Sequence, residues 1–268
     1  MKKKFRLGVI GAGFMSTAII KGVLKSALCD CKDICVSDSM QLALDKISQL
    51  GVHTSLSNLE LVNNCEYVLF AVKPQNLNDV LLSINGCKCE KFISIMAGVK
   101  KQRIKNVISG AKVARSMPNT PCSLGVGAIG LDLSDYDCAE DKDFICSLFS
   151  ALGQVVLVSE DKLNAVTGVS GSAPAYFYLF VKSIIDSGVK HGLSYEQAKL
   201  LAVNTMLGSS KMILENKEKS IDELINAVCS KGGTTIEAVN SFNADGLDFI
   251  VNKAINACVS RSTELENL

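Results

Sequence analysis

The chain has 268 residues, of which 48% are hydrophobic and 21% charged, a composition typical of a globular protein and far from a disordered one. Its 28 basic and 27 acidic side chains leave a net charge of +1, which provides no basic field for nucleic acid or for an anionic membrane. The 11 cysteines are odd in number and lack the C-x2-C pairs of a zinc site, so we expect free thiols in a cytoplasmic protein and no metal. Function is therefore expected at a local site.

Before about residue 160, apolar runs of strand length alternate with helical periodicity. Glycine interrupts the first run too early for a signal peptide or a membrane span. Strands that are apolar throughout and alternate with helices predict a parallel sheet covered on both faces, hence an α/β domain over residues 1–159. The predicted strands span residues 5–10, 34–37, 67–72, 92–96, 112–115, 126–131 and 154–158.

After residue 160 the strand pattern stops, and every segment has helical periodicity. Ser194-x-x-Gln197 and Ser220-x-x-Glu223 predict capping boxes. Long apolar helices with little sheet to cover predict an all-α domain over residues 160–268, a bundle that a second subunit would complete. The predicted helices span residues 173–188, 194–215, 221–229, 235–242 and 247–262.

Residues 11–16 follow the first strand and open a helix, in the pattern G-x-G-x-x-G of dinucleotide-binding turns, except that Ser16 replaces the third glycine. Gly11 permits a tight turn, Gly13 lets a pyrophosphate approach the backbone, and the helix N-terminus supplies free N–H groups. A plain tight turn is the alternative. The acidic Asp38 at the end of the next strand favours dinucleotide binding.

Asp38 also bears on the choice of cofactor. A carboxylate there would bond the ribose 2′-OH of NADH and repel the 2′-phosphate of NADPH. Residues 39–42 contain no Lys or Arg to receive that phosphate, which favours NADH. Ser37 could equally be the residue that faces the ribose, so the preference stays open.

A second glycine-rich turn, at residues 229–237, precedes a predicted helix. Thr234-x-x-Glu237 has the spacing of an ordinary capping box, in which case Gly232 and Gly233 merely turn the chain. The same helix N-terminus would also form an anion site, because its N–H groups are exposed. The pattern alone leaves both interpretations open.

Five motifs occur in order along the chain. They lie at residues 11–18, 71–75, 117–121, 166–176 and 232–235, and read GAGFMSTA, AVKPQ, MPNTP, VTGVSGSAPAY and GGTT. Together they closely resemble those of pyrroline-5-carboxylate reductases. The resemblance runs from about Phe5 to Leu265, with departures at Lys231, where the family usually has Pro, and at Ala173, where Gly is commoner.

The resemblance implies a Rossmann-like N-terminal domain and an all-α C-terminal dimerisation domain that interleaves with its partner in a homodimer. In many members of the family the dimers assemble further into decamers. It also implies the reduction of 1-pyrroline-5-carboxylate to L-proline, the final step of proline biosynthesis, with NADPH or NADH as hydride donor.

The resemblance also carries over cofactor residues by motif. The first motif should hold the pyrophosphate, Ser37 and Asp38 should lie near the adenosine ribose, and Asn58 beside the adenosine half. Several assignments have a structural alternative: Asn58 follows the capping residue Ser57, Lys73 could be charged simply because it is exposed at the end of a buried strand, and Gly98 suits a simple turn. The pyrophosphate residues are Ile10, Gly11, Ala12, Gly13, Phe14 and Met15, and those on the nicotinamide side are Ala71, Val72, Lys73, Pro74, Met96, Ala97 and Gly98.

For the substrate, the resemblance places Thr235 where its hydroxyl reaches the imine nitrogen. Because a Thr hydroxyl is a poor acid, we expect it to orient an iminium whose proton comes partly from solvent. Glu218 aligns near the ring nitrogen, with a solvated charge in a helix link as the alternative, and Thr167 supports the pocket. The expected carboxylate-binding residues are Ser230, Gly232, Gly233, Thr234 and Thr235, with Lys231 adding charge.

Two other functions fit part of the sequence. A β-hydroxyacid dehydrogenase also joins a Rossmann domain to helices, but its catalytic lysine sits in a glycine-rich motif that Lys182 lacks, and Asp186 replaces the expected Asn. A nucleotide-sensing module would explain the absence of a strong acid or base in the motifs. The intact Gly232-Gly233-Thr234-Thr235 turn argues against it.

Overall fold

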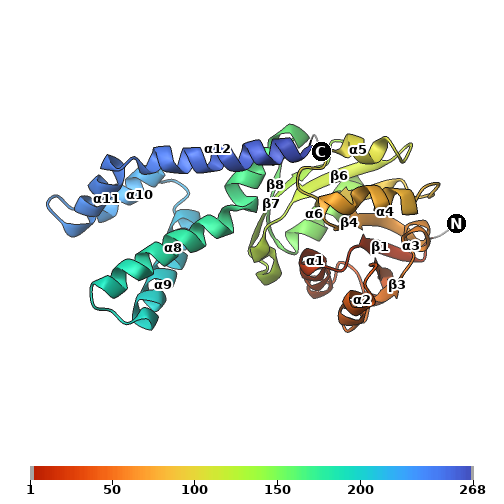
Figure 1. Ribbon diagram of the computed structural model, residues 1–268, viewed down its shortest axis with the longest axis horizontal. Helices are drawn as coiled ribbons and strands as arrows, with labels where there is room; N and C mark the ends of the chain where they lie inside the picture. Colours follow the sequence, from red (N-terminus) through yellow and green to blue (C-terminus); the bar gives the residue numbers. More distant parts are fainter. Residues whose placement is uncertain (1–2, 267–268) are drawn as a thin grey trace. The chain divides into compact units, whose positions relative to one another are not determined.

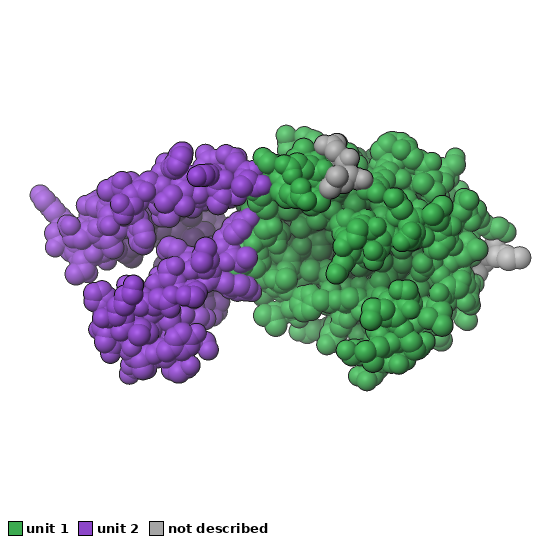
Figure 2. Space-filling view, in the orientation of Figure 1, with its two compact units in different colours: residues 1–174, 258–268 green, residues 175–257 purple. Residues whose placement is uncertain are grey.

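The computed structural model describes residues 3–266, and its contacts form two compact units (Figures 1 and 2). One unit comprises Met1–Pro174 with Cys258–Leu268, and the other comprises Ala175–Ala257. Residues 1, 2, 267 and 268 of the predicted domains lie outside the described residues. The domain boundary predicted between residues 159 and 160 rests on the change of hydrophobic pattern in the sequence, and it stays a prediction. In the structure, contacts place residues 160–174 in the same unit as the sheet.

The first unit is built on an eight-stranded sheet in the order β3-β2-β1-β4-β5-β6-β7-β8 (Figure 1). The predicted parallel pairing is confirmed from β3 to β6, whereas β7 runs antiparallel to β6. Residues 118–126 join these two strands, a connection too short for a crossover. The strands are β1 Phe5–Ile10, β2 Ile34–Ser37, β3 His53–Ser55, β4 Cys65–Phe70, β5 Lys91–Ser94, β6 Lys112–Met117, β7 Gly127–Asp132 and β8 Gly153–Leu157.

Helices cover both faces of this sheet, which is why its central strands are mostly apolar and buried, whereas the edge strands β3 and β8 are largely exposed. Leu7 and Val9 of β1 belong to one core, together with the apolar side chains of α1, α2 and α6. Phe5 and Ile10 of the same strand belong to a second core with α3, α4 and α5. The helices are α1 Phe14–Lys25, α2 Gln41–Ser48, α3 Asn58–Asn64, α4 Leu77–Ser83, α5 Lys101–Lys105 and α6 Ala139–Ser150.

A short α7 (Leu163–Val166) and a π-helical turn (Thr167–Gly171) follow the last strand. The Thr167 hydroxyl is buried and donates to the Leu163 carbonyl at 2.9 Å. The Ser172 N–H bonds to the Thr167 carbonyl at 2.9 Å, five residues back, which widens the helix there. The fourth motif, residues 166–176, thus runs from the end of α7 through this π-helical turn into the helix that begins at Ala173.

The second unit is helical, as the sequence predicts. Both predicted capping boxes are confirmed: Ser194 caps α9 and Ser220 caps α10, each with a returning bond from the side chain three residues later. The helices are α8 Ala173–Lys190, α9 Tyr195–Glu215, α10 Ile221–Val228, α11 Thr234–Ala244 and α12 Leu247–Glu266, of which α8 and α12 cross the unit boundaries.

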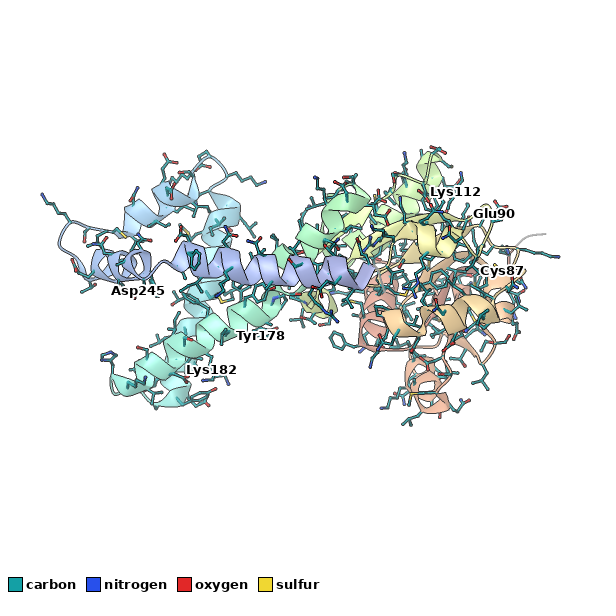
Figure 3. The ribbon with its side chains drawn as sticks, turned by 45° about the horizontal axis from the view of Figure 1, so that its top comes forward. Cys87, Glu90, Lys112, Tyr178, Lys182 and Asp245 are labelled. Carbon is teal, nitrogen blue, oxygen red and sulfur yellow. The ribbon has the colours of Figure 1, made fainter. Side chains whose placement is uncertain are left out.

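This helical unit buries few of its apolar side chains. Its core consists of Ile185, Ala198 and Ala202, packed by Val181. On α8, by contrast, Tyr178 is 66% exposed, and it projects from the helix together with Lys182 (Figure 3). Within the part of the chain that the structure describes, no helix is both long and apolar enough to cross a membrane. Apolar helix faces of this kind are typical of surfaces that another chain covers.

Candidate functional site

Backbone hydrogen bonds bring several of the predicted motifs to one edge of the sheet. The Gly11 N–H donates to the Ser37 carbonyl at 2.7 Å, and the Ala71 N–H donates to the Ile10 carbonyl at 2.9 Å. The Ile95 N–H continues the series to the Phe70 carbonyl at 3.2 Å. The segments that follow β1, β2, β4 and β5 therefore meet at the carboxyl ends of their strands, where open α/β sheets bind ligands.

The first glycine turn has the geometry that a pyrophosphate requires. Gly11 has φ +105°, and a Cβ there would lie 2.8 Å from the Ala71 carbonyl oxygen, so only glycine fits. At Gly13 a Cβ would meet no atom within 4 Å, which leaves this backbone open to a ligand. Gly13 is the N-cap residue of α1, no side chain bonds the cap position, and the first turn carries no acidic residue. The N–H groups of that turn can therefore receive an anion.

Asp38 holds the glycine turn in place. Its Oδ2 accepts the Ala12 N–H at 2.8 Å, and its Oδ1 accepts the Met40 N–H at 2.9 Å. The carboxylate thus has a structural contact with the turn in addition to any contact with a ribose. Its predicted role in cofactor choice stays a prediction.

The neighbouring Ser37 is fully buried, and its hydroxyl donates to Oδ1 of Asn58 at 2.7 Å. The Asn58 amide in turn donates to the Ser83 hydroxyl at 2.9 Å. Ser57 caps α3 by accepting the Glu60 N–H, so Asn58 occupies the first helical position, as the structural alternative expects. Both Ser37 and Asp38 are thus engaged by neighbouring residues, and which of the two faces a ribose stays a prediction.

A cavity of about 560 Å³ lies over this edge. It brings together nine of the predicted cofactor residues and adds Asn76 and Asp79, from the turn before α4 and from α4 itself, which the sequence analysis missed. The sequence signal that could have identified Asn76 and Asp79 is their position shortly after Lys73 and Pro74. The lining is Ile10, Gly11, Gly13, Ser37, Asp38, Ser39, Met40, Asn58, Ala71, Val72, Lys73, Asn76, Asp79 and Val80.

The other predicted cofactor residues lie around this cavity rather than on it. Ala12 and Phe14 line an adjoining cavity of about 380 Å³ with Gly13 and Met40. Met15 packs against the core below α1. Pro74 begins a 3₁₀ turn (Pro74–Asn76) after β4, next to Lys73.

Met96, Ala97 and Gly98 form the segment that follows β5. Met96 and Gly98 are buried. Gly98 has φ +66°, and a Cβ there would lie 2.6 Å from Cβ of Leu265 in the last turn of α12. Glycine is thus required for packing against α12, a stronger constraint than the simple turn that the sequence suggests.

The second glycine turn leads into α11 in the second unit. The helix begins at Thr234 with Gly233 as its cap, and no side chain bonds the cap position, so the capping box of the alternative interpretation does not form. Gly232 has φ +71°, and a Cβ on Gly233 would lie 2.4 Å from the Ser230 hydroxyl. The N–H groups of this turn are left without a side-chain acceptor, which favours the anion-site interpretation.

The remaining predicted substrate residues are exposed. Thr235 lies in the first turn of α11, and Glu218 in the link between α9 and α10.

The structure gives no support to the alternative of a β-hydroxyacid dehydrogenase with Lys182 as its catalytic lysine. Lys182 forms an exposed ion pair with Asp186 along α8, outside any glycine turn.

Thiols do not supply a reactive group at the cofactor edge. Burial raises the pKa of Cys35, on β2, to about 11, so this thiol stays protonated near neutral pH. All eleven cysteines are free. In residues 3–266 no cluster of His, Cys, Asp and Glu side chains could hold a metal ion.

Comparison with known proteins yields matches over nearly the whole chain. Residues 160–265 match the pyrroline-5-carboxylate reductase dimerisation family, and residues 6–98 match the NADP oxidoreductase coenzyme F420-dependent family. The pyrroline-5-carboxylate reductases of Vibrio alginolyticus and Haemophilus influenzae are 33% and 35% identical, each with 98% of both chains covered.

Solved structures agree with these sequence matches. The pyrroline-5-carboxylate reductase of Coxiella burnetii superposes with a TM-score of 0.88 at 32% identity, covering 98% of this chain and 99% of the other. The Plasmodium falciparum pyrroline carboxylate reductase, solved with NADP bound, also superposes with a TM-score of 0.88, at 28% identity, covering 99% of this chain and 100% of that one.

Proposed function

Because the chain belongs to the pyrroline-5-carboxylate reductase family, we propose that it reduces 1-pyrroline-5-carboxylate to L-proline with NAD(P)H as hydride donor, the final step of proline biosynthesis. It is an oxidoreductase that acts on a C=N bond. One observation carries this conclusion: the chain presents two helix N-termini, at Gly13 and Gly233, that have glycine approaches and no side-chain cap. One suits a pyrophosphate and the other the carboxylate of the imine.

Within the first unit, the residues over the 560 Å³ cavity fit a dinucleotide. The N–H groups of the first turn of α1 would hold the pyrophosphate, and Asp38 and Asn58 the adenosine side. Lys73 and the segment Met96, Ala97 and Gly98 would border the nicotinamide side. When bound, NAD(P)H supplies the hydride, and the chain supplies orientation and the polar surroundings.

Within the second unit, the turn before α11 would hold the substrate. The N–H groups and side chains of Ser230, Gly232, Gly233 and Thr234 bind its carboxylate, with Lys231 adding a positive charge. The exposed Thr235 hydroxyl donates a hydrogen bond toward the imine nitrogen, and Glu218 lies near the ring. Because a threonine hydroxyl is a poor acid, the rate enhancement comes chiefly from positioning, which contributes about 7–11 kcal/mol in favourable intramolecular reactions.

The predicted domains, 1–159 for the cofactor and 160–268 for substrate and dimerisation, belong to this proposal. The match to a dimerisation family, which begins at residue 160, supports the second boundary. We propose a homodimer that buries the exposed apolar faces of α8 and α9, with decamers as the further assembly. Sedimentation velocity distinguishes monomer, dimer and decamer, and a monomer at working concentrations contradicts this part.

The eleven free cysteines support a cytoplasmic location, since thiols persist in a reducing compartment. Fractionation of cells that express the tagged chain tests this assignment, and recovery with an oxidising compartment contradicts it.

The activity is tested with purified protein, the imine and either cofactor. We expect oxidation of NADH or NADPH only when 1-pyrroline-5-carboxylate is present, with L-proline as the product identified by chromatography. Silence with both cofactors overturns the proposal. Cofactor binding without turnover would indicate a nucleotide-sensing module instead.

A further inference from the structure

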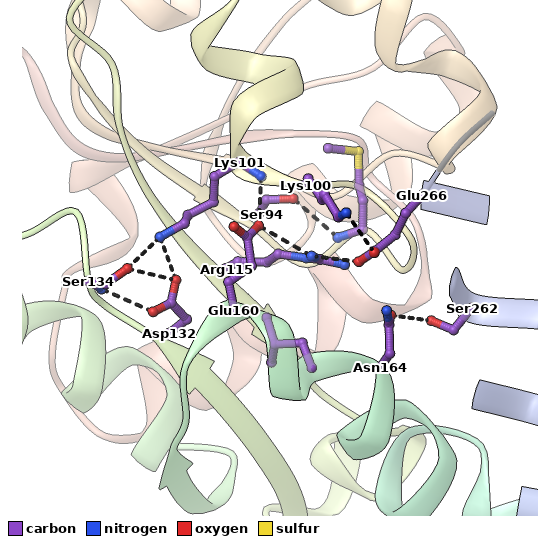
Figure 4. A network of polar contacts seen from close by, with 12 residues as sticks. Ser94, Lys100, Lys101, Arg115, Asp132, Ser134, Glu160, Asn164, Ser262 and Glu266 are labelled. Carbon is purple, nitrogen blue, oxygen red and sulfur yellow. Dashed lines mark hydrogen bonds and ion pairs between the residues drawn. The ribbon is translucent and has the colours of Figure 1, made fainter. Parts of the chain in front are cut away.

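A cluster of buried charges lies between the last turn of α12, strand β6 and the start of α5 (Figure 4). At its centre, Nη1 of Arg115 lies 3.0 Å from Oε1 of Glu266 and 3.3 Å from Oε1 of Glu160. The side chains of Arg115 and Glu266 are only 4% and 5% exposed. Solvent screening is therefore weak, and these contacts hold their elements firmly.

Both carboxylates reach on to the residues that close the segment after β5, here called the β5 loop (residues 95–100). Glu160 accepts the N–H of Lys101 at 2.8 Å, at the beginning of α5. Oε2 of Glu266 lies 3.4 Å from Nζ of Lys100. The two anions that flank Arg115 thus fix the far end of the β5 loop.

The same helix turn also packs directly on the middle of the loop. A Cβ on Gly98 would lie 2.6 Å from Leu265 Cβ and 3.4 Å from the Ser262 carbonyl oxygen. Ser262 is buried, and its hydroxyl donates to Oδ1 of Asn164 at 2.7 Å, which fixes the helix turn itself. The conformation of the β5 loop therefore depends on where this last turn lies.

Glu266 is ionised near neutral pH. Burial by itself would raise the pKa of its carboxyl, but hydrogen bonds with Arg115 and Asn164 and the charge of Lys100 hold the pKa below its usual range. Buried ion pairs are often no more stabilising than apolar side chains of similar size. Stabilisation of the fold therefore does not by itself explain why these buried side chains are charged. Their directional contacts with the β5 loop provide a reason, because such contacts fix the position of the loop.

The β5 loop begins beside the cofactor cavity. The Ile95 N–H bonds to the Phe70 carbonyl at the end of β4, and Ala71, which directly follows that strand, lines the cavity. Asp38, which follows β2, and Asn58, at the start of α3, lie on the adenosine side and bond to other residues than those of the cluster. The cluster thus touches one end of the cofactor site.

We propose that Glu266, through Arg115 and the β5 loop, is a positioning residue for the nicotinamide half of the cofactor and not for its adenosine half. This inference rests on the proposed function, because that function places the nicotinamide beside Met96, Ala97 and Gly98. The last turn of α12 is then part of the cofactor site without contacting the cofactor.

The test compares Glu266→Gln with Glu264→Gln. Glu264 lies on the same helix turn but is 61% exposed and pairs with Arg261, so it provides a matched control. For each variant, calorimetry gives the affinity for NADPH and for 2′-phospho-ADP-ribose, which lacks the nicotinamide ring, and steady-state kinetics give kcat and KM.

For E266Q we expect about a tenfold loss of NADPH affinity and of kcat, because a misplaced loop spoils the alignment for hydride transfer. Affinity for 2′-phospho-ADP-ribose should change by less than about twofold, and E264Q should match the wild type in every measurement, since exposed pairs contribute little. An equal loss of affinity for both ligands would indicate a merely structural role for Glu266, and no loss of affinity would indicate no role. Either result overturns the inference.

A second variant keeps the test decisive if E266Q does not fold. Glu160→Gln leaves the last turn of α12 unchanged and removes the charge of the other carboxylate, which pairs with Arg115 and accepts the Lys101 N–H at the end of the β5 loop, and we expect the same selective loss for NADPH. Equal losses or no loss overturn the inference here as well. A wild-type protein that fails to bind NADPH, or to turn over with the imine, counts against the proposed function instead.

Discussion

The Asp38 carboxylate accepts N–H groups from Ala12 and Met40, so it stabilises the glycine turn whichever cofactor binds. Each of its oxygens still has a free lone pair for a ribose hydroxyl. A 2′-phosphate would instead meet a fixed negative charge, and Asp79 adds a second one to the cavity lining, against a single Lys73. Asp38 therefore couples the geometry of the glycine turn to the choice between NADH and NADPH.

Asp38→Asn removes the charge and keeps one of the two oxygens that accept N–H groups of the turn, so the ratio between the two cofactors, in which the loss common to both cancels, reports the effect of the charge. We expect the ratio of kcat/KM for NADPH to that for NADH to rise at least about tenfold, because the variant removes the like charge that repels the 2′-phosphate. Asp38→Ser should shift the ratio in the same direction but weaken both cofactors, because it loses the bonds to the turn. An unchanged ratio in both variants means that Asp38 faces away from the ribose.

Thr235→Ala tests the residue assigned to the imine nitrogen. We expect kcat to fall about a hundredfold, as when one preorganised donor is removed, while cofactor affinity stays unchanged. Ser241→Ala, a hydroxyl removed from the exposed part of the same helix, is the control and should retain full activity. Comparable losses in kcat and in cofactor affinity would contradict the assigned role of Thr235.

At the scale of elements, the sequence predicts best where the pattern and the backbone bonding coincide. The bounds of β1 and β2 agree with prediction, whereas β4 ends two residues earlier, since Ala71 and Val72 continue the apolar run into the cavity wall. β3 was missed because it is a three-residue, mostly polar edge strand. Hydrophobic periodicity cannot detect such a strand.

The candidate site was predictable where a local motif specifies backbone geometry. Gly11 and Gly13 have the conformation and open space that their spacing indicates. Asn76 and Asp79 were not predictable, because they reach the cavity through the fold of the turn and helix after β4. The contact of Gly98 with Leu265 joins residues far apart in sequence, which no motif encodes.

The capping box at Ser220 stabilises the N-terminus of α10. Ser220→Ala removes the side chain that accepts the Glu223 N–H at 3.1 Å, and it should destabilise α10 by about 1 kcal/mol. Urea unfolding followed by circular dichroism measures this loss. Ser183→Ala in α8, whose hydroxyl bonds back to the Leu179 carbonyl, should cost nothing measurable. Equal losses in the two variants would show that the cap at Ser220 is not special.

At the scale of the whole molecule, the first unit buries several carboxylates on cationic or hydroxyl partners. Asp141 accepts the Tyr67 hydroxyl at 2.5 Å and lies 2.6 Å from Nζ of Lys91. Burial alone would raise the pKa of Asp141, but these bonds hold the pKa below its usual value. The pKa values of Asp135 and Glu266 are lowered in the same way, by lysine or arginine partners that outweigh burial.

Acid should therefore unfold this protein through these carboxylates. Their unfolded pKa values are 3.8 for Asp and 4.5 for Glu, and the folded values are lower. The unfolded chain thus binds more protons in this window, so their stabilisation is complete above those unfolded values and is lost as pH falls through the folded ones. Urea unfolding between about pH 3 and 6 should show that the free energy of unfolding decreases as the pH is lowered, by up to about 1.4 kcal/mol per pH unit for each proton taken up.

Asp141→Asn should flatten the dependence of the free energy of unfolding on pH. Asp143→Asn, which changes an exposed residue on the same helix, should not. Equal slopes in the wild type and D141N would place the acid sensitivity elsewhere.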